Sequence, residues 1–172
     1  MAQAAERAKK TIALVGLPGA GKTSVGRRLA ARLHLPFQDS DAAIEAETGL
    51  AVPDIFAQAG ETRFRALEGA VIARLAEGPP CVLATGGGAF LDPGSRALLL
   101  ARCIIVWLDG EVGLFAARAG SRPLLDPVDP TRSLQRLAAA RNPIYAEAHL
   151  RIDCGTLRPE RIVDLILTAL RI

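Results

Sequence analysis

The chain has 172 residues, half of them hydrophobic, which is the size and composition of a single globular domain. Its net charge of +3, from 21 basic and 18 acidic residues, is too small to indicate nucleic acid as a partner. The apolar runs are shorter than the roughly 18 residues that a membrane span needs, and residues 1–10 lack the apolar core of a secretory signal. We therefore expect a cytoplasmic protein with no membrane partner and with an N-terminal extension over residues 1–10. The cysteines Cys81, Cys103 and Cys154 have no metal-like spacing and are expected to be buried thiols.

A glycine-rich loop over residues 16–23, GLPGAGKT, follows the apolar run 11–15 and precedes an amphipathic helix over residues 24–33. The loop fits G-x-x-x-x-G-K-[ST], in which backbone N–H groups at a helix N-terminus surround phosphate oxygens. We expect Lys22 to reach the outer phosphates and the Thr23 hydroxyl to hold Mg²⁺. A glycine turn that merely joins a strand to a helix is the alternative, and the flanking pattern disfavours it.

Two carboxylates, Asp39 and Asp41, end a predicted second strand over residues 36–41. Open α/β sheets bind ligands at the carboxyl ends of their strands. Alternate residues of a strand face opposite ways, so we expect one carboxylate to face Mg²⁺ and the other an acceptor hydroxyl. In the simpler interpretation, Asp41 caps the following helix and Asp39 is only solvated.

Helical patterns follow over residues 42–47, 53–59 and 61–76, with Gly60 between the last two, and segment 42–76 is interpreted as a substrate-binding lobe. A buried strand over residues 81–85 then leads into Gly86, Gly87 and Gly88. Three glycines without side chains let a ligand touch the backbone, although a flexible turn has the same composition.

The second half of the chain alternates strands over residues 103–108 and 150–153 with helices over residues 93–101, 111–119, 132–148 and from 159 onward. Asp109 superficially matches a Walker B carboxylate but is expected to start the next helix. Residues 120–130 hold three prolines and should form an irregular loop, after which Thr131 can cap a helix. This alternation predicts a three-layer α/β domain with a mainly parallel sheet.

Three arginines occupy suggestive places: Arg65 in the helix after Gly60, Arg122 in the proline-rich loop and Arg141 beside an Asn-Pro interruption. A mobile arginine neutralises charge during phosphoryl transfer, and arginines bind carboxylates through two parallel hydrogen bonds. Taken singly, each is more often a surface residue.

Six separated motifs make the chain resemble the shikimate kinases. The aspartate pair, the Gly-Glu-x-x-Phe-Arg segment, the triple glycine and the Arg-Pro-Leu-Leu segment are together specific to that family, whereas the phosphate loop is shared more widely. The six motifs are 16–23 GLPGAGKT, 39–41 DSD, 60–65 GETRFR, 86–88 GGG, 122–125 RPLL and 141–145 RNPIY.

The resemblance implies one domain with an adenylate-kinase-like P-loop NTPase fold, five parallel strands ordered 2-3-1-4-5, and a lid over residues 119–130. It implies MgATP-dependent phosphorylation of the 3-hydroxyl of shikimate, on the chorismate route to aromatic amino acids. By motif, Lys22, Asp41 and Arg122 would be catalytic, with Asp41 as base or orienting group, and Thr23 and Asp39 would serve the metal. The nucleotide would be bound by Gly19, Ala20, Gly21, Lys22, Thr23, Ser24, Arg122 and Arg158, and shikimate by Asp41, Arg65, Gly86, Gly87, Gly88 and Arg141, with Glu61 in support.

Two other classes remain as alternatives. One is another small-molecule kinase on the same fold, of the gluconate or nucleoside monophosphate type. Recognition of a planar base usually needs more aromatic or amide side chains than residues 42–76 contain. The other is a nucleotide-dependent switch, which would need a guanine-reading motif that this chain lacks. We expect a monomer that binds no nucleic acid.

Overall fold

One parallel sheet organises the chain, whose computed structural model describes residues 10–119 and 128–172. The strand order is β2-β3-β1-β4-β5, which confirms the expected fold. Predictions that fall on residues 1–9 and 120–127, including Arg122 and most of the lid, lie outside the described residues. The strands are β1 Ile12–Val15, β2 Phe37–Asp39, β3 Val82–Ala84, β4 Ile104–Asp109 and β5 Leu150–Asp153.

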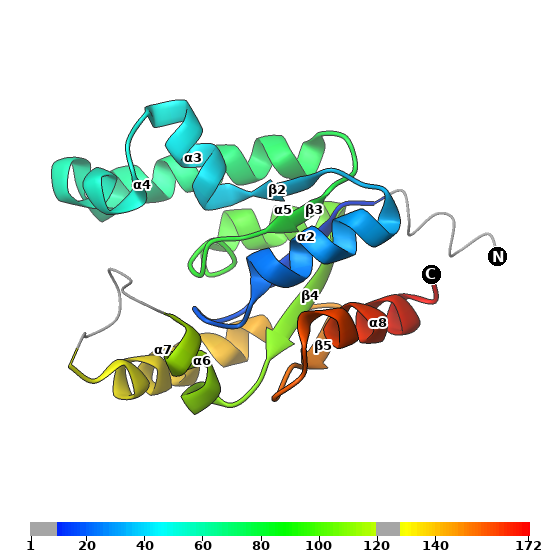
Figure 1. Cartoon of the computed structure of the whole chain (residues 1–172). Coiled ribbons are helices and arrows are strands. Elements are labelled where there is room, and N and C mark those ends of the chain that lie inside the picture. The colour runs from blue at the N-terminus through cyan, green and yellow to red at the C-terminus, as the bar shows by residue number, and fades with distance from the viewer. Residues whose placement is uncertain (1–9, 120–127) are drawn as a thin grey trace.

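Helices cover both faces of this sheet (Figure 1). Helices α2 and α8 pack against each other on one face, and α4 packs against α5 on the other. The helices are α2 Lys22–Leu33, α3 Ser40–Thr48, α4 Val52–Glu77, α5 Pro93–Arg102, α6 Val112–Ala119, α7 Pro130–Tyr145 and α8 Pro159–Leu170. None of the helices in the described ranges combines the length and apolar character needed to cross a membrane.

The central strand β1 lies at the middle of the core, since all four of its side chains are 0% exposed. Ile12 aligns with Val82 of β3 on one side and with Ile104 of β4 on the other. Because the strands are parallel, their carboxyl ends lie at one edge of the sheet, and the loops after β1 and β3 meet the first turn of α3 there.

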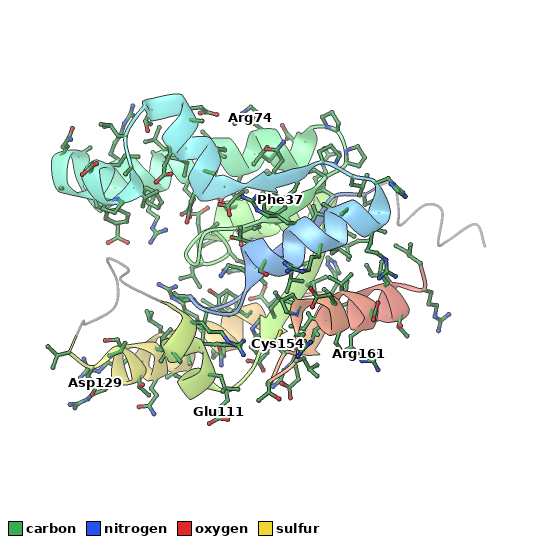
Figure 2. The ribbon with its side chains drawn as sticks, in the orientation of Figure 1. Phe37, Arg74, Glu111, Asp129, Cys154 and Arg161 are labelled. Atoms are coloured by element: carbon green, nitrogen blue, oxygen red, sulfur yellow. The ribbon has the colours of Figure 1, made fainter. Side chains whose placement is uncertain are left out.

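Close packing of α2 on the sheet depends on a small residue. A Cβ at Gly26 would lie 2.6 Å from Cε2 of Phe37, so any larger side chain would push this ring away. Phe37 lies beside α2 (Figure 2), and the Arg27 guanidinium covers its ring at 5.3 Å. Val25 and Leu29 are buried, as the apolar spacing predicted, together with Gly26 and Ala30, whereas Leu33 of the same predicted face is only partly buried.

Two predicted helix starts are wrong. Asp109 does not start a helix: it ends β4 and accepts a hydrogen bond of 2.8 Å from Nε of Arg151. The cap of α7 is Asp129, whose carboxylate accepts from the N–H of Arg132, and not Thr131. Both errors arise because several polar residues precede each helix, and the one that turns its oxygen toward the helix depends on the backbone path.

Candidate active site

The phosphate loop joins β1 to α2 and is shaped by glycines. Gly19 and Gly21 have φ values of 83° and 87°, in the left-handed region that glycine adopts without strain. Gly21 is the N-cap of α2 and supplies no side-chain cap, so the first N–H groups of the helix point into the space enclosed by the loop. Such a helix N-terminus attracts anions, as the sequence predicted for residues 16–23.

Lys22 and Thr23 begin α2 at the mouth of this loop. The Lys22 ammonium donates to the carbonyl oxygens of Gly16 at 2.8 Å and Leu17 at 3.0 Å. The Thr23 hydroxyl donates to Oδ2 of Asp39 at 2.9 Å, which brings the two predicted metal residues together. With its hydrogen directed at Asp39, the Thr23 oxygen retains its lone pairs for a cation.

The aspartate pair is placed differently from the prediction. Strand β2 ends at Asp39, whereas Asp41 lies in the first turn of α3, so the argument from alternating strand faces is wrong. Asp39 is the helix cap, because its Oδ1 accepts from the N–H of Asp41 at 3.1 Å. The two carboxylates still have different surroundings: Asp39 faces Thr23, and Asp41 faces the triple glycine.

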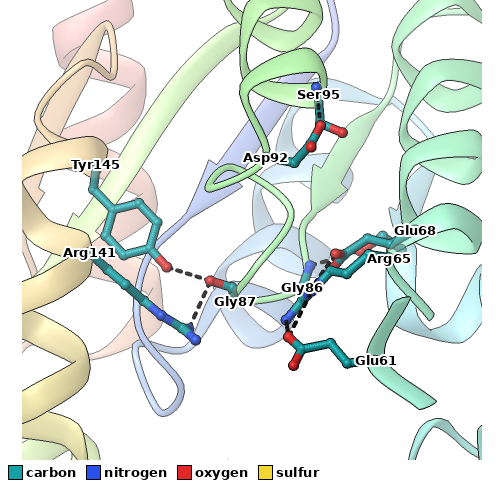
Figure 3. A network of polar contacts seen from close by, with 10 residues as sticks. Glu61, Arg65, Glu68, Gly86, Gly87, Asp92, Ser95, Arg141 and Tyr145 are labelled. Atoms are coloured by element: carbon teal, nitrogen blue, oxygen red, sulfur yellow. Dashed lines mark hydrogen bonds and ion pairs between the residues drawn. The ribbon is translucent and has the colours of Figure 1, made fainter. Parts of the chain in front are cut away.

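The triple glycine follows β3 and is held by three side chains from two helices. The N–H of Gly86 donates to the buried Ser40 hydroxyl at 2.8 Å. The carbonyl of Gly87 accepts from Nη1 of Arg141 at 2.9 Å and from the Tyr145 hydroxyl at 2.7 Å (Figure 3). These bonds hold the segment against α3 and α7, which disfavours the alternative of a flexible turn.

Steric crowding explains why glycine occupies positions 86 and 88 of this segment. A Cβ at Gly86 would lie 2.6 Å from Oδ1 of Asp41 and 2.7 Å from Oε1 of Glu68. A Cβ at Gly88 would lie 2.6 Å from Cζ of Arg65. Any side chain here would thus displace the charged groups around it.

Arg65 lies across from Arg141 and is held by two carboxylates of its own helix α4 (Figure 3). Its Nη1 donates to Oε2 of Glu68 at 2.7 Å, and its Nη2 donates to Oε1 of Glu61 at 3.1 Å. Glu61 supports Arg65 as predicted but is largely exposed, so its contribution is small. Arg141 is only 6% exposed and comes from α7 on the other side of the pocket.

Glu68 is a buried carboxylate that the sequence analysis missed. It is 2% exposed, and its Oε1 has no hydrogen-bond partner among the described residues. Burial raises the pKa of Glu68 above its ordinary value, and the hydrogen bond from Arg65 only partly offsets this. The i,i+3 spacing of Arg65 and Glu68 on a helix was the available signal, but spacing alone does not show burial.

Two pockets open side by side at this edge of the sheet. One is lined by the phosphate loop, and the other lies between α4, the triple glycine and α7. The residues common to both form a wall between them: Pro18, Asp41, Glu45, Gly86 and Gly87. The first pocket is also lined by Gly19, Gly21, Lys22, Thr23, Ser24, Asp39, Ala42, Thr85 and Arg118, and the second by Val52, Pro53, Phe56, Phe64, Arg65, Glu68, Gly88 and Arg141.

The remaining predicted residues lie apart from these linings or outside the described residues. Ala20 is buried within the phosphate loop, and Arg158 is the exposed N-cap of α8. Arg122 lies in the undescribed segment 120–127. Within residues 10–119 and 128–172 no cluster of three or more His, Cys, Asp or Glu side chains is arranged to hold a metal ion.

Comparison with known proteins agrees with this geometry. A shikimate kinase of Caulobacter vibrioides is 50% identical over 165 residues, covering 94% of this chain and 82% of the relative. One of Paramagnetospirillum magneticum is 50% identical over 167 residues, covering 95% of this chain and 86% of the relative. Among solved structures, a shikimate kinase from Acinetobacter baumannii in complex with shikimate superposes with a TM-score of 0.87 at 40% identity, covering 97% of this chain and 98% of the other.

A more distant similarity is to a gluconokinase from Sinorhizobium meliloti, with a TM-score of 0.57 and 22% identity, covering 96% of this chain and 93% of the other, and it shows the shared fold alone. A family model for shikimate kinase matches residues 18–171, which include the phosphate-loop lysine, the aspartate pair, the triple glycine and both pocket arginines. The chain belongs to the shikimate kinase family.

Proposed function

We propose that this chain transfers the γ-phosphoryl group of MgATP to the 3-hydroxyl of shikimate, forming shikimate 3-phosphate and ADP. The observation that carries the proposal is the wall shared by the two pockets. A phosphate in the loop and a hydroxyl in the neighbouring pocket can meet at Asp41, which lines both. Membership of the shikimate kinase family and the shikimate complex of the Acinetobacter relative support this choice of substrate.

On the nucleotide side, the backbone N–H groups of residues 19–24 hold the phosphates at the positive end of α2. Lys22 leaves the carbonyls of Gly16 and Leu17 and turns to the outer phosphates, whose charge it neutralises. Arg122 closes on the phosphates from segment 119–130, and Arg158 contacts the adenine.

A magnesium ion fits Thr23 and Asp39. Mg²⁺ prefers hydroxyl, carboxylate and water oxygens and usually takes few ligands from the protein, which agrees with this small donor set. When bound there, it supplies positive charge next to the transferring phosphoryl group. Thr23 would hold the ion directly, and Asp39 through water.

On the acceptor side, Arg65 and Arg141 bind the carboxylate of shikimate from opposite sides of the pocket. Each presents a planar group of donors that suits a carboxylate. The backbone of Gly86, Gly87 and Gly88 lies against the ring, and Asp41 accepts a hydrogen bond from the attacking hydroxyl. As the new P–O bond forms and the bond to ADP breaks, the hydroxyl proton leaves toward Asp41.

In this proposal each part of the chain has a defined role. The catalytic unit is a single domain that acts as a monomer in this proposal, and the described residues of one chain line both pockets. Segment 42–76 is the substrate-binding lobe, with α3 and α4 packed together. Residues 119–130 form the lid.

A coupled ADP-release assay tests the proposal with shikimate, gluconate and nucleoside monophosphates as acceptors. Shikimate should stimulate ADP release strongly and the other acceptors little. No stimulation by shikimate would overturn the proposal, and a larger response to gluconate would favour the alternative kinase class.

Two kinds of variant test the assigned roles. Asp41→Asn should lower kcat severely and leave ATP binding nearly intact, because the side chain keeps its size but is uncharged and does not take up the hydroxyl proton. Arg65→Ala and Arg141→Ala should raise the KM for shikimate much more than that for ATP. Equal effects on both substrates would contradict the carboxylate-binding role.

A further inference from the structure

The Tyr145 hydroxyl lies between the two pockets. Tyr145 ends α7 and is 1% exposed, with its ring packed between Phe90 and Trp107 at centroid distances of 6.4 and 6.1 Å. Its hydroxyl lies 2.7 Å from the carbonyl oxygen of Gly87 and 3.4 Å from that of Gly16. The first carbonyl belongs to the triple glycine, and the second to the first residue of the phosphate loop.

Each of these carbonyls has a second donor, and each second donor is a substrate-binding cation. Lys22 donates to Gly16 O at 2.8 Å, and Arg141 donates to Gly87 O at 2.9 Å. The contacts therefore run without a break from Lys22 through Gly16, Tyr145 and Gly87 to Arg141. Burial raises the pKa of the Tyr145 hydroxyl, so it stays a neutral donor across the physiological range.

A phenol has one hydrogen and can satisfy only one of these carbonyls well. In the described structure Gly87 O is the nearer acceptor, and Lys22 serves Gly16 O. When Lys22 turns to the phosphates, the buried Gly16 carbonyl loses that donor, and an unpaired buried carbonyl is costly. The Tyr145 hydroxyl is already within 3.4 Å and can replace it.

We propose that Tyr145 is a positioning residue whose single hydrogen moves from Gly87 O to Gly16 O when the nucleotide takes Lys22, and that this exchange couples the two substrate pockets. The inference rests on the proposed function, in which Lys22 serves the nucleotide and Arg141 the acceptor.

The exchange sets the sign of the coupling. With nucleotide bound, Gly87 O keeps only the bond from Arg141, which holds that guanidinium against the backbone and away from the acceptor's carboxylate. Through this route the nucleotide weakens acceptor binding, and by linkage the acceptor weakens nucleotide binding equally. In Tyr145→Phe, Gly87 O relies on Arg141 whether or not nucleotide is present, so this route is lost.

The experiment measures, by calorimetry, the Kd of shikimate with and without a saturating non-hydrolysable analogue of MgATP. In Tyr145→Phe the Kd without nucleotide should rise about five- to tenfold, the effect of one hydrogen bond. The ratio of the two Kd values should fall by the same factor. Other sources of coupling are common to both proteins and cancel in this comparison.

Thr11→Val is the matched control. Thr11 is a buried hydroxyl at the opposite end of β1, where it accepts from the N–H of Cys81 at 3.2 Å. Its removal should lower stability and leave the Kd ratio unchanged. An equal change of the ratio in Thr11→Val would show that the effect is a general response to a lost buried hydroxyl, and would overturn the proposal.

A second variant tests the exchange without nucleotide. Lys22→Met removes the donor from Gly16 O permanently, so Tyr145 should turn to Gly16 and the Kd of shikimate alone should rise. Adding Lys22→Met to Tyr145→Phe should then raise that Kd no further, whereas additive effects would contradict the exchange. An unchanged Kd ratio in Tyr145→Phe would overturn this inference alone, and failure of the wild type to bind shikimate would overturn the proposed function with it.

Discussion

Replacing Gly88 by alanine tests the placement of Arg65 without substituting any charged residue. The new Cβ would lie 2.6 Å from Cζ and 2.8 Å from Nη2 of Arg65, closer than real contacts allow. Gly88 is absent from the glycines with positive φ, so alanine fits the backbone there without strain. The overlap is with the end of a flexible side chain, and the guanidinium can therefore move aside while the fold is kept.

The size of the effect follows from the bond that must break. Moving the guanidinium to an ordinary contact distance separates its Nη1 from Oε2 of Glu68, now at 2.7 Å. A charge-assisted hydrogen bond is worth roughly 1.5–3 kcal/mol, and the 29% exposure of the Arg65 side chain favours the lower end. We expect a loss of about 1.5 kcal/mol in acceptor binding, or about a tenfold higher KM for shikimate.

Steady-state kinetics with each substrate varied in turn is the assay. The KM for ATP should change less than about twofold, because the loop contacts are untouched. Gly69→Ala is the matched control: it adds a methyl group on the same helix as Arg65, where its nearest neighbour would be Oγ of Ser95 at an ordinary 3.8 Å. An unchanged KM for shikimate in Gly88→Ala, or equal increases for both substrates, would refute the reasoning.

Three further predictions concern stability and reactivity. Burial raises the pKa of Glu68, so the protonated carboxyl contributes to the free energy of unfolding in full below its ordinary pKa. This contribution is lost as the pH rises through the raised pKa. Urea unfolding should therefore show the free energy of unfolding of the wild type, relative to that of Glu68→Gln, declining over this pH range and then levelling. Gly19→Ala combines a φ of 83° with a Cβ 2.8 Å from the carbonyl carbon of Phe115, so thermal unfolding should show a loss of about 2 kcal/mol or more, together with weaker nucleotide binding. Burial raises the pKa values of Cys103 and Cys154 to about 12, and at pH 8 a thiol reagent should label them only as the protein unfolds; rapid labelling of the native protein would contradict their burial.

Most of the fold could be predicted because its signals are local. Short apolar runs separated by amphipathic segments of helical length indicate a parallel α/β sheet, and glycine and proline mark most of the element ends. The strand order came from the family resemblance, since periodicity does not specify which strands are neighbours. Gly60 was predicted to end one helix and begin another, and its φ of 76° separates two helical halves of α4.

The site could be predicted as a set of residues but not as a set of contacts. Lys22, Thr23, Asp39, Asp41 and the residues predicted to bind the acceptor line the two pockets at this edge of the sheet, and their roles stay predictions. Their partners depend on side-chain directions that tertiary packing determines: the sequence offered Asp41 as the cap of the helix, and Asp39 caps it.

Buried polar residues explain the remaining omissions. Tyr145 belongs to the 141–145 motif and Glu68 has an i,i+3 spacing to Arg65, but neither signal shows that the carboxylate faces the pocket or that the hydroxyl reaches two loops. Both facts depend on the distance between segments that lie far apart along the chain, and only the folded structure contains that information.

The bend at Gly60 sets the direction of the first turns of α4, which line the second pocket with Val52, Pro53 and Phe56. Without this bend, the 26 residues of α4 would form one rod about 39 Å long, and its first turns would project past the pocket instead of lining it. A Cβ at Gly60 would meet nothing within 4 Å, so the position is restrained by its backbone angle and not by its neighbours. A different backbone angle at Gly60 would move the first turns of α4 relative to the second pocket, while the groups at the end of the sheet would stay in place.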